Sequence, residues 1–149
     1  MDNLPRKINS LMVEVFNDIL SIEETTLKNG HFHDVSITEV HTLEAIGLHA
    51  TRSMGEVAKR LKITVGTLTV AVTNLVGKGY VSRFRDEADR RVVQIKLTNK
   101  GRLLYRIHQK FHSDMIQVAL AGLSPLEGET LARALDNIRL FLAQSYSMT

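Results

Sequence analysis

The sequence predicts a mainly α-helical fold with one small β-hairpin. Three observations support this fold class. Apolar residues recur every three to four positions over most of the 149-residue chain, and serine or threonine stands before several of these periodic segments, as helix-capping residues do. One stretch, residues 81–97, instead alternates apolar and polar residues on either side of a charged loop. We expect one compact domain from a chain of this length.

The N-terminal half should contain four helices. The first covers residues 4–27, where apolar residues have helical spacing, and the second runs from the capping residue Ser36 to Gly47. Ser53, with Glu56 three residues later, is typical of a capping box, and it should open a short third helix. The third helix and a tight turn then lead into the fourth.

The fourth helix is predicted for residues 64–78, although its many threonine and valine residues favour a strand. Leu68, Val72 and Leu75 share one helical face, and Gly79 stands where a helix commonly stops. Because this spacing persists over the whole segment, we interpret it as the second helix of a helix-turn-helix.

A hairpin and two long helices complete the chain. The two alternating segments flank the charged loop 86–91 and should pair as a two-stranded hairpin. Thr98 then caps a long helix that ends at Gly122, and Ser124 with Pro125 starts the last helix. A helix-turn-helix followed by a hairpin is a winged helix-turn-helix, in which the hairpin is the wing.

Within residues 1–149, two parts of the single domain have different tasks in this interpretation. Residues 36–101 hold the helix-turn-helix and the wing, whereas residues 1–35 and 102–149 hold the long terminal helices. The small central part cannot cover all the apolar stripes of the terminal helices, so we predict a homodimer built on them. Packing of these helices within one subunit is the alternative.

Composition narrows the class of protein. The chain has no cysteine, which excludes disulfides and thiolate chemistry, and no apolar run is long enough to span a membrane. We therefore expect a soluble protein of the bacterial cytoplasm with no membrane partner. The segment from Lys59 to Arg102 contains eleven basic residues and only three acidic ones. Such a local excess is typical of a nucleic-acid-binding face, and a solvated charged surface is the alternative.

The second helix of a helix-turn-helix enters the major groove of double-stranded DNA. With its apolar face turned to the core, the candidate base-contacting residues are Thr64, Gly66, Thr67, Thr69, Val70, Thr73 and Asn74. Threonine and valine can contact the thymine methyl group, and no arginine is present on this face to select guanine. We therefore predict an A·T-rich, palindromic operator.

The wing supplies the candidate arginines Arg83, Arg90 and Arg91. A narrow A·T-rich minor groove attracts inserted arginine, and Arg90 and Arg91 lie in the loop at the tip of the hairpin. Asp89 would be repelled by phosphate, so we expect it to hold a neighbouring arginine through a charge-assisted hydrogen bond. An exposed salt bridge with no part in binding is the alternative.

Residues 85–101 resemble the wing signature of the MarR family: Asp-x-Arg, alternating strand residues, then Leu-Thr-x-x-Gly. The resemblance implies a winged helix-turn-helix dimer in which Arg91 enters the minor groove and Asp89 supports it. Within that family, IEETTLKNG, SITEVHTLEAIG, ITVGTLTVAVTNL, DRRVV and GRLLYRIHQKFH look like the fatty-acid-synthesis repressors of Gram-positive bacteria. This likeness implies repression of fatty-acid-synthesis genes, with long-chain acyl groups on acyl carrier protein as the corepressor.

Two histidines, His108 and His112, are spaced four residues apart, which brings two imidazoles to one metal on a helix. Together with Glu24 and His41 they resemble the metal site of the zinc-responsive branch of the MarR family, without that branch's additional cysteine. The resemblance implies one tetrahedral zinc. The alternative is a hydrogen-bonded polar cluster between the dimerising helices and the DNA-binding part, and no cofactor is otherwise expected.

These features predict a ligand-controlled transcriptional repressor and not an enzyme. The nearest enzymatic alternative is a small zinc hydrolase using His41, His108 and His112, but HQKFH has no glutamate between its histidines to act as general base. A non-specific nucleoid protein is a third class, which the modest net charge of +3 disfavours. A zinc-responsive repressor is the alternative closest to the prediction.

Overall fold

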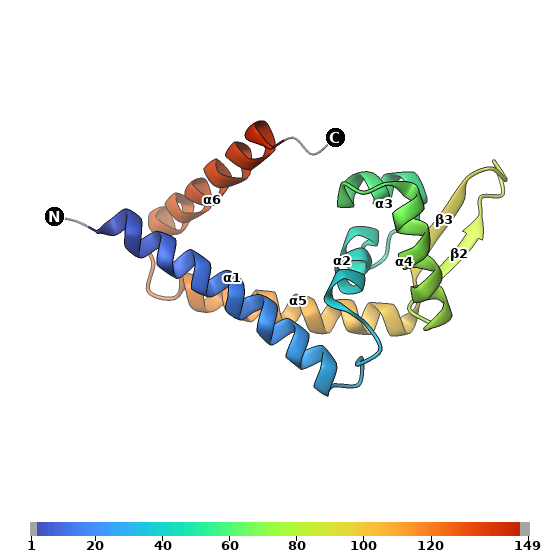
Figure 1. Cartoon of the computed structure of the whole chain (residues 1–149), viewed down its shortest axis with the longest axis horizontal. Helices are drawn as coiled ribbons and strands as arrows, with labels where there is room; N and C mark the ends of the chain where they lie inside the picture. The colour runs from blue at the N-terminus through green and yellow to red at the C-terminus, as the bar shows by residue number, and fades with distance from the viewer. Residues whose placement is uncertain (1–2, 147–149) are drawn as a thin grey trace.

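The computed structural model describes residues 3–146, so residues 1–2 and 147–149 of the predicted dimerisation segments lie outside the described residues. The described chain is mostly helical with a small β-sheet, as predicted, and it has three short strands (Figure 1). In chain order the elements are α1 (Leu4–Asn29), α2 (Ile37–Ile46), β1 (Arg52–Ser53), α3 (Met54–Leu61), α4 (Val65–Gly77), β2 (Val81–Arg85), β3 (Val93–Leu97), α5 (Asn99–Leu120) and α6 (Pro125–Ser145).

The predicted capping residues do begin the helices. In each case the side-chain oxygen accepts a hydrogen bond from the backbone N–H three residues later, at Ser36, Ser53, Thr64, Thr98 and Ser124. Ser36 and Ser124 form complete capping boxes, with Glu39 and Glu127. At Ser53 the structure shows only the bond from the Glu56 backbone N–H. The prediction of a full capping box at this position was therefore wrong.

The segment with mixed propensity, α4, is a helix. Leu68, Val72 and Leu75 are fully buried along one face, as predicted, and Gly79 follows the helix with a φ of 86°. The buried apolar face outweighs the preference of threonine and valine for strands, because packing routinely overrides intrinsic propensity.

The sheet has one strand more than predicted. It is antiparallel in the order β1-β3-β2, and the predicted hairpin is its β2-β3 part, with Val81 opposite Leu97 and Arg85 opposite Val93. The added strand, β1, pairs through Arg52 and Ser53 with the other edge of β3. Two residues are too few to show an alternating pattern, so no sequence signal announced this strand.

The apolar core lies at one end of the molecule. In Figure 1, α2, α3, α4 and the hairpin gather around the start of α5, while α6 begins at the far end of α5 and lies apart from them. All buried apolar residues in the described chain fall within 35–104: Val35, Val40, Leu43, Ile46, Met54, Val57, Ala58, Leu68, Val72, Leu75, Tyr80, Val81, Ile95, Leu97 and Leu104. All of them except Val35 and Leu104 belong to the DNA-binding part predicted from the sequence, so this part holds nearly all of the buried core.

The terminal helices have the opposite character. Among described residues, α6 has none that is buried, and α1 has only Glu23. Large apolar side chains stand exposed along these helices, including Phe16 and Leu126 at 65% and 68% of their maximal area. No helix between residues 3 and 146 combines the length and apolar character that a membrane crossing requires.

Candidate nucleic-acid interface

The outer face of α4 presents the residues predicted to read bases. All seven candidates, from Thr64 to Asn74, are exposed, and Val70 keeps 65% of its area in solvent. An exposed valine surrounded by threonines forms a surface with methyl groups and few charges, which suits contact with thymine methyl groups.

Two of these threonines already use their hydroxyl groups within the helix. The Thr69 hydroxyl donates to the Val65 carbonyl at 2.8 Å. The Thr64 oxygen accepts from the Thr67 N–H at 3.1 Å, and its hydroxyl donates to the Thr67 side chain at 2.9 Å. Thr69 therefore offers a base a methyl group and an acceptor, while the role of Thr64 in this structure is to cap α4.

The tip of the wing holds Arg91 in a fixed orientation. Asp89 accepts hydrogen bonds from the Arg91 Nε at 3.1 Å, from its terminal nitrogen at 3.3 Å and from its backbone N–H at 3.1 Å. These hydrogen bonds also lower the pKa of Asp89. Because the Arg91 side chain is still 92% exposed, Asp89 orients the guanidinium without covering it, as predicted.

Two more arginines stand between the tip and the recognition helix. Arg83 donates to the Thr73 hydroxyl oxygen at 3.0 Å, which joins the wing to α4. Arg85 donates to the Arg90 carbonyl at 2.9 Å, which braces the loop. Arg85 was not among the residues predicted from the sequence, although the alternation of β2 places it on the same face as Arg83.

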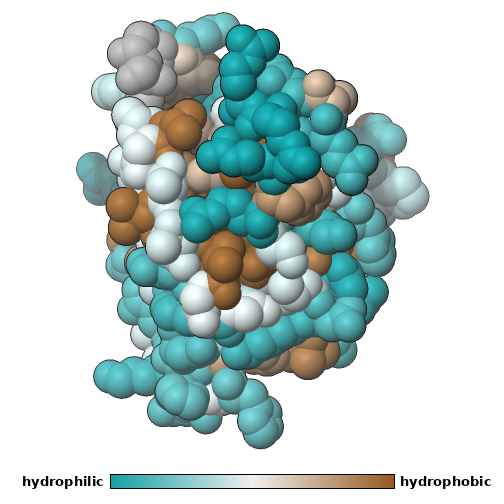
Figure 2. All heavy atoms as spheres, turned by 90° about the vertical axis from the view of Figure 1, so that its right-hand side faces the viewer, coloured by the Kyte–Doolittle hydropathy of each residue, from teal (hydrophilic) through white to brown (hydrophobic). Residues whose placement is uncertain are grey.

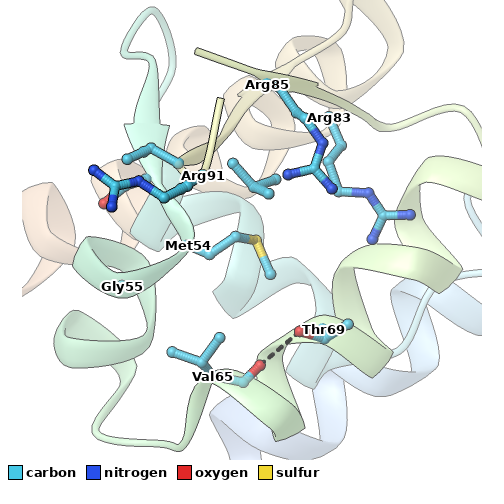
Figure 3. A pocket seen from close by; sticks show the side chains of 10 residues that line it. Met54, Gly55, Val65, Thr69, Arg83, Arg85 and Arg91 are labelled. Atoms are coloured by element: carbon cyan, nitrogen blue, oxygen red, sulfur yellow. Dashed lines mark hydrogen bonds between the residues drawn. The ribbon is translucent and has the colours of Figure 1, made fainter. Parts of the chain in front are cut away.

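A groove separates the wing from the recognition helix. Arg83, Arg85 and Arg91 line it from the wing, with the guanidinium groups of Arg83 and Arg91 pointing to opposite sides, while Met54 and Thr69 line it from α3 and α4 (Figure 3). Figure 2 views this end of the molecule and shows hydrophilic side chains gathered in a protruding mass beside smaller hydrophobic patches. Three guanidinium groups beside a helix that can enter the major groove form a surface suited to double-stranded DNA.

The histidines form a second cluster, where α1, α2 and α5 meet. The His108 Nε2 lies 2.8 Å from the Glu44 carboxylate and 3.0 Å from the His112 Nε2. The Glu23 Oε1 lies 2.9 Å from the His112 Nε2 and 3.6 Å from the His108 Nε2. The hydrogen bond to Glu44 raises the pKa of His108, against the effect of burial.

This cluster corrects the predicted ligand set. His41, His108 and His112 belong to it, but Glu24 is exposed and lines a different hollow beside Lys28. Glu23 takes its place because successive helical residues point about 100° apart. Glu44 also belongs to the cluster and was not predicted from the sequence.

The donor set of the cluster fits a cation. Glu23, His41 and His108 have ligand atoms within 4.8 Å of one another, as do Glu44, His108 and His112. The buried Glu23 Oε1 lies near the nitrogens of His108 and His112, but neither contact has the geometry of a hydrogen bond in the described structure. Imidazole nitrogens with carboxylate oxygens are ligands that zinc accepts, and a metal would satisfy that oxygen.

Several known proteins are similar to this chain in sequence and fold. The model of the MarR family matches residues 33–92. The crystal structure of Streptococcus pneumoniae FabT in complex with DNA is 40% identical, with a TM-score of 0.84, and the match covers 93% of this chain and 97% of that one. For a mutant of Escherichia coli MarR complexed with operator DNA the identity is 26%, the TM-score 0.64 and the coverage 91% and 96%.

A curated relative gives the same result. YkoM of Bacillus subtilis, an uncharacterized HTH-type transcriptional regulator, is 28% identical over 111 residues, which cover 74% of this chain and 72% of YkoM. The match to FabT spans almost the whole of both chains, and its 40% identity is high enough to indicate a common family as well as a common fold. The chain therefore belongs to the MarR family of winged helix-turn-helix, DNA-binding transcriptional regulators.

Proposed function

We propose that the protein is a homodimeric repressor of bacterial fatty-acid-synthesis genes, acting in the cytoplasm on an A·T-rich palindromic operator. The observation that supports DNA binding is the exposed Arg91, which Asp89 orients beside the methyl-rich face of α4. The likeness to FabT and the sequence resemblance to fatty-acid-synthesis repressors support the choice of target genes. No catalytic step forms part of this proposal.

The homodimer rests on the exposed apolar faces of the terminal helices. Leu131, Leu135 and Leu142 follow one another along α6 at helical spacing and all are exposed. A second copy can cover such a stripe in a closed two-fold arrangement. Two recognition helices would then face half-sites about one turn of DNA apart.

Long-chain acyl groups on acyl carrier protein are the corepressor in this proposal. An apolar groove of about 510 Å³ runs between the end of α5 and α6, lined in part by Ile116, Leu120 and Leu135. A smaller apolar cavity of about 70 Å³ lies between α1 and α5, beside Phe111. Only the larger one falls within the ~300–1,000 Å³ of usual ligand pockets.

Operator affinity of metal-stripped protein tests the proposal. An A·T-rich fatty-acid-synthesis promoter is titrated with protein alone, with zinc, and with long-chain acyl carrier protein, at one salt concentration. We expect the acyl carrier to tighten binding at least tenfold and zinc to leave it unchanged. Specific binding that the acyl carrier does not alter would contradict the corepressor, and equal binding to random DNA would contradict the repressor itself.

A zinc-responsive repressor is the second candidate, favoured by two overlapping groups of close ligand atoms, Glu23 with His41 and His108, and Glu44 with His108 and His112. A zinc ion there would tie α1, α2 and α5 together and so connect the terminal helices to the DNA-binding part. In the same titration, tightening by zinc alone would favour this candidate.

Glu23 and Glu24 provide a matched pair of variants for the metal site. Glu23→Gln should weaken zinc binding by about tenfold or more, since it removes a charged ligand, whereas Glu24→Gln should leave it unchanged. Calorimetric zinc titration of both variants measures this. Equal affinities would place the metal, if bound, outside the cluster.

A further inference from the structure

The connector between α1 and α2, residues 30–36, packs against the C-terminal end of the recognition helix. Tyr80 follows α4 by three residues and is fully buried. Its hydroxyl donates to the Asp34 Oδ1 at 2.7 Å, and its ring packs beside Phe32, with centroids 6.1 Å apart. Tyr80, the first buried residue after the recognition helix, is thus hydrogen-bonded to the connector that follows α1.

A second contact joins the same two regions. Lys78, which ends α4, donates to both oxygens of Glu39 in the first turn of α2, at 3.0 and 3.2 Å. The Glu39 side chain is only 13% exposed and also accepts from the Ser36 N–H at 3.1 Å. This partial burial matters, because a fully exposed ion pair would contribute little.

Lys100 closes the group from the first turn of α5. Its Nζ donates to the Lys78 carbonyl at 3.0 Å, lies 4.4 Å from the centre of the Tyr80 ring and 4.0 Å from the Asp34 Oδ2. A cation here satisfies a carbonyl left free at the end of α4 and balances the Asp34 charge. We name the five residues Asp34, Glu39, Lys78, Tyr80 and Lys100 the α4 latch.

The protonation states of the latch are set by its own contacts. The hydrogen bond from Tyr80 lowers the pKa of Asp34, with the lysines acting in the same direction. Burial, and then the bond to Asp34, raises the pKa of Tyr80. At neutral pH Asp34 is therefore a charged acceptor and Tyr80 a neutral donor, which makes this hydrogen bond one of the stronger kind.

We propose that the α4 latch positions the recognition helix relative to α1, and so sets the half-site spacing that the dimer accepts. This inference rests on the proposed dimeric DNA-binding function. All five latch residues lie around the C-terminal end of α4, whereas the exposed Thr69 and Val70 lie in the middle of that helix. They are therefore positioning residues: they determine where the base-contacting face lies, without contacting bases themselves.

The geometry explains why spacing is the property affected. α1 has 26 residues, so it is about 39 Å long at 1.5 Å per residue. If its apolar face is fixed in a dimer, the orientation of α4 depends on what joins α4 to the end of α1. The latch supplies this join through side chains, because Tyr80 and Asp34 are 46 residues apart in the chain.

Tyr80→Phe tests the proposal, since it removes the hydroxyl and keeps the buried ring. An operator is first selected from a random duplex pool by the wild-type protein, and then altered by one base pair added to or removed from its centre. We expect the wild type to prefer the selected spacing and Tyr80→Phe to lose about tenfold of that preference, with an unchanged dimer mass. Asp34→Asn keeps an acceptor and should retain most of the preference.

Lys78→Met gives an independent measurement if Tyr80→Phe does not fold, because Lys78 is partly exposed. Lys110→Met is its matched control, since Lys110 pairs with Asp114 on α5 outside the latch. Lys78→Met should lower the spacing preference and Lys110→Met should not. Variants that lose affinity equally for all spacings would overturn the latch alone, whereas a wild type without any spacing preference would overturn the proposed dimeric function and the latch together.

Discussion

The DNA-binding part and the terminal helices are built by the same local rules but differ in what covers them. Ser36 before α2 and Ser124 before α6 both form complete capping boxes. Yet α2 buries Val40, Leu43 and Ile46 completely, while no described residue of α6 is buried. Local signals therefore start a helix in both regions, and only the DNA-binding part encloses its apolar face within one chain.

This difference assigns separate tasks to the two regions. In proteins, most of the stability of a helix comes from packing its apolar face and not from its intrinsic propensity. The DNA-binding part has that packing from its own residues, so it can hold α4 and the wing in a fixed geometry. In the proposed dimer a second copy would give the terminal helices the same stabilisation, and this would link dimerisation to the placement of two DNA-binding parts.

Breaking the apolar stripe of α6 should have the largest effect. Leu142→Asp would put a charge into the proposed dimer interface in both copies, at a cost of roughly 3 kcal/mol or more, which corresponds to at least about 100-fold weaker dimerisation. Sedimentation equilibrium and operator binding measure the two consequences. Asn137→Asp adds the same charge at a polar position of α6 and is the control. A Leu142→Asp protein that remains a dimer would show that this stripe is covered in another way.

Removing Arg91 should have the next largest effect, and it should act on DNA binding alone. Arg91→Ala is expected to weaken operator binding by about 1–3 kcal/mol, or roughly 5- to 150-fold, with an unchanged dimer mass. Arg106→Ala, an exposed arginine of α5 outside the wing, is the control for loss of positive charge. Binding curves at matched salt give the comparison. Unchanged affinity of Arg91→Ala would refute its assignment to the minor groove.

What could be predicted from the sequence follows from this division. The caps, the helical character of α4 and the Asp89–Arg91 contact depend on residues close in the chain, and the structure confirms them. The strand β1 could not be predicted, because its two residues become a strand only by pairing with β3, some forty residues later.

The site residues show the same limit. Helical spacing correctly joined His108 and His112, but the choice between Glu23 and Glu24 depends on how α1 is rotated against α5, which no pattern within α1 fixes. Glu44 faces His108 only because α2 packs on α5. The latch between Tyr80 and Asp34 likewise exists only in the folded chain, so it carried no sequence signal.

Substitutions on the base-contacting face of α4 should weaken operator binding less than substitutions in the wing. Thr69→Ser and Thr73→Ser each delete one methyl group and keep the hydroxyl that bonds Val65 or Arg83. If those methyl groups contact thymine, each variant should lose roughly 1 kcal/mol, about fivefold, at one or two positions of the operator. Binding to a set of single-base operator variants measures this. A uniform loss across all sequences would argue against base reading by this face.

The smallest expected effect lies at the junction of the two regions, in the acid stability that Asp34 confers. Its pKa is lowered in the folded protein, first by the hydrogen bond from Tyr80, so the folded state gains stability above the unfolded pKa of about 3.9 and loses it as the pH falls through the folded value. Because the side chain is 38% exposed, solvent screening should limit the gain to a few tenths of a kcal/mol.

Urea unfolding at pH 7 and at about pH 3, at one protein concentration, measures that contribution. The free energy of unfolding of Asp34→Asn should fall less on acidification than that of the wild type, since its amide does not titrate. Asp18→Asn, on the exposed surface of α1, is the matched control. If Asp34→Asn is as sensitive to acid as the wild type, the connector stabilises the DNA-binding part through the Phe32–Tyr80 contact and not through the charge of Asp34. In that case apolar packing stabilises the junction between the two regions, and the latch depends on the shape of its side chains more than on their charge.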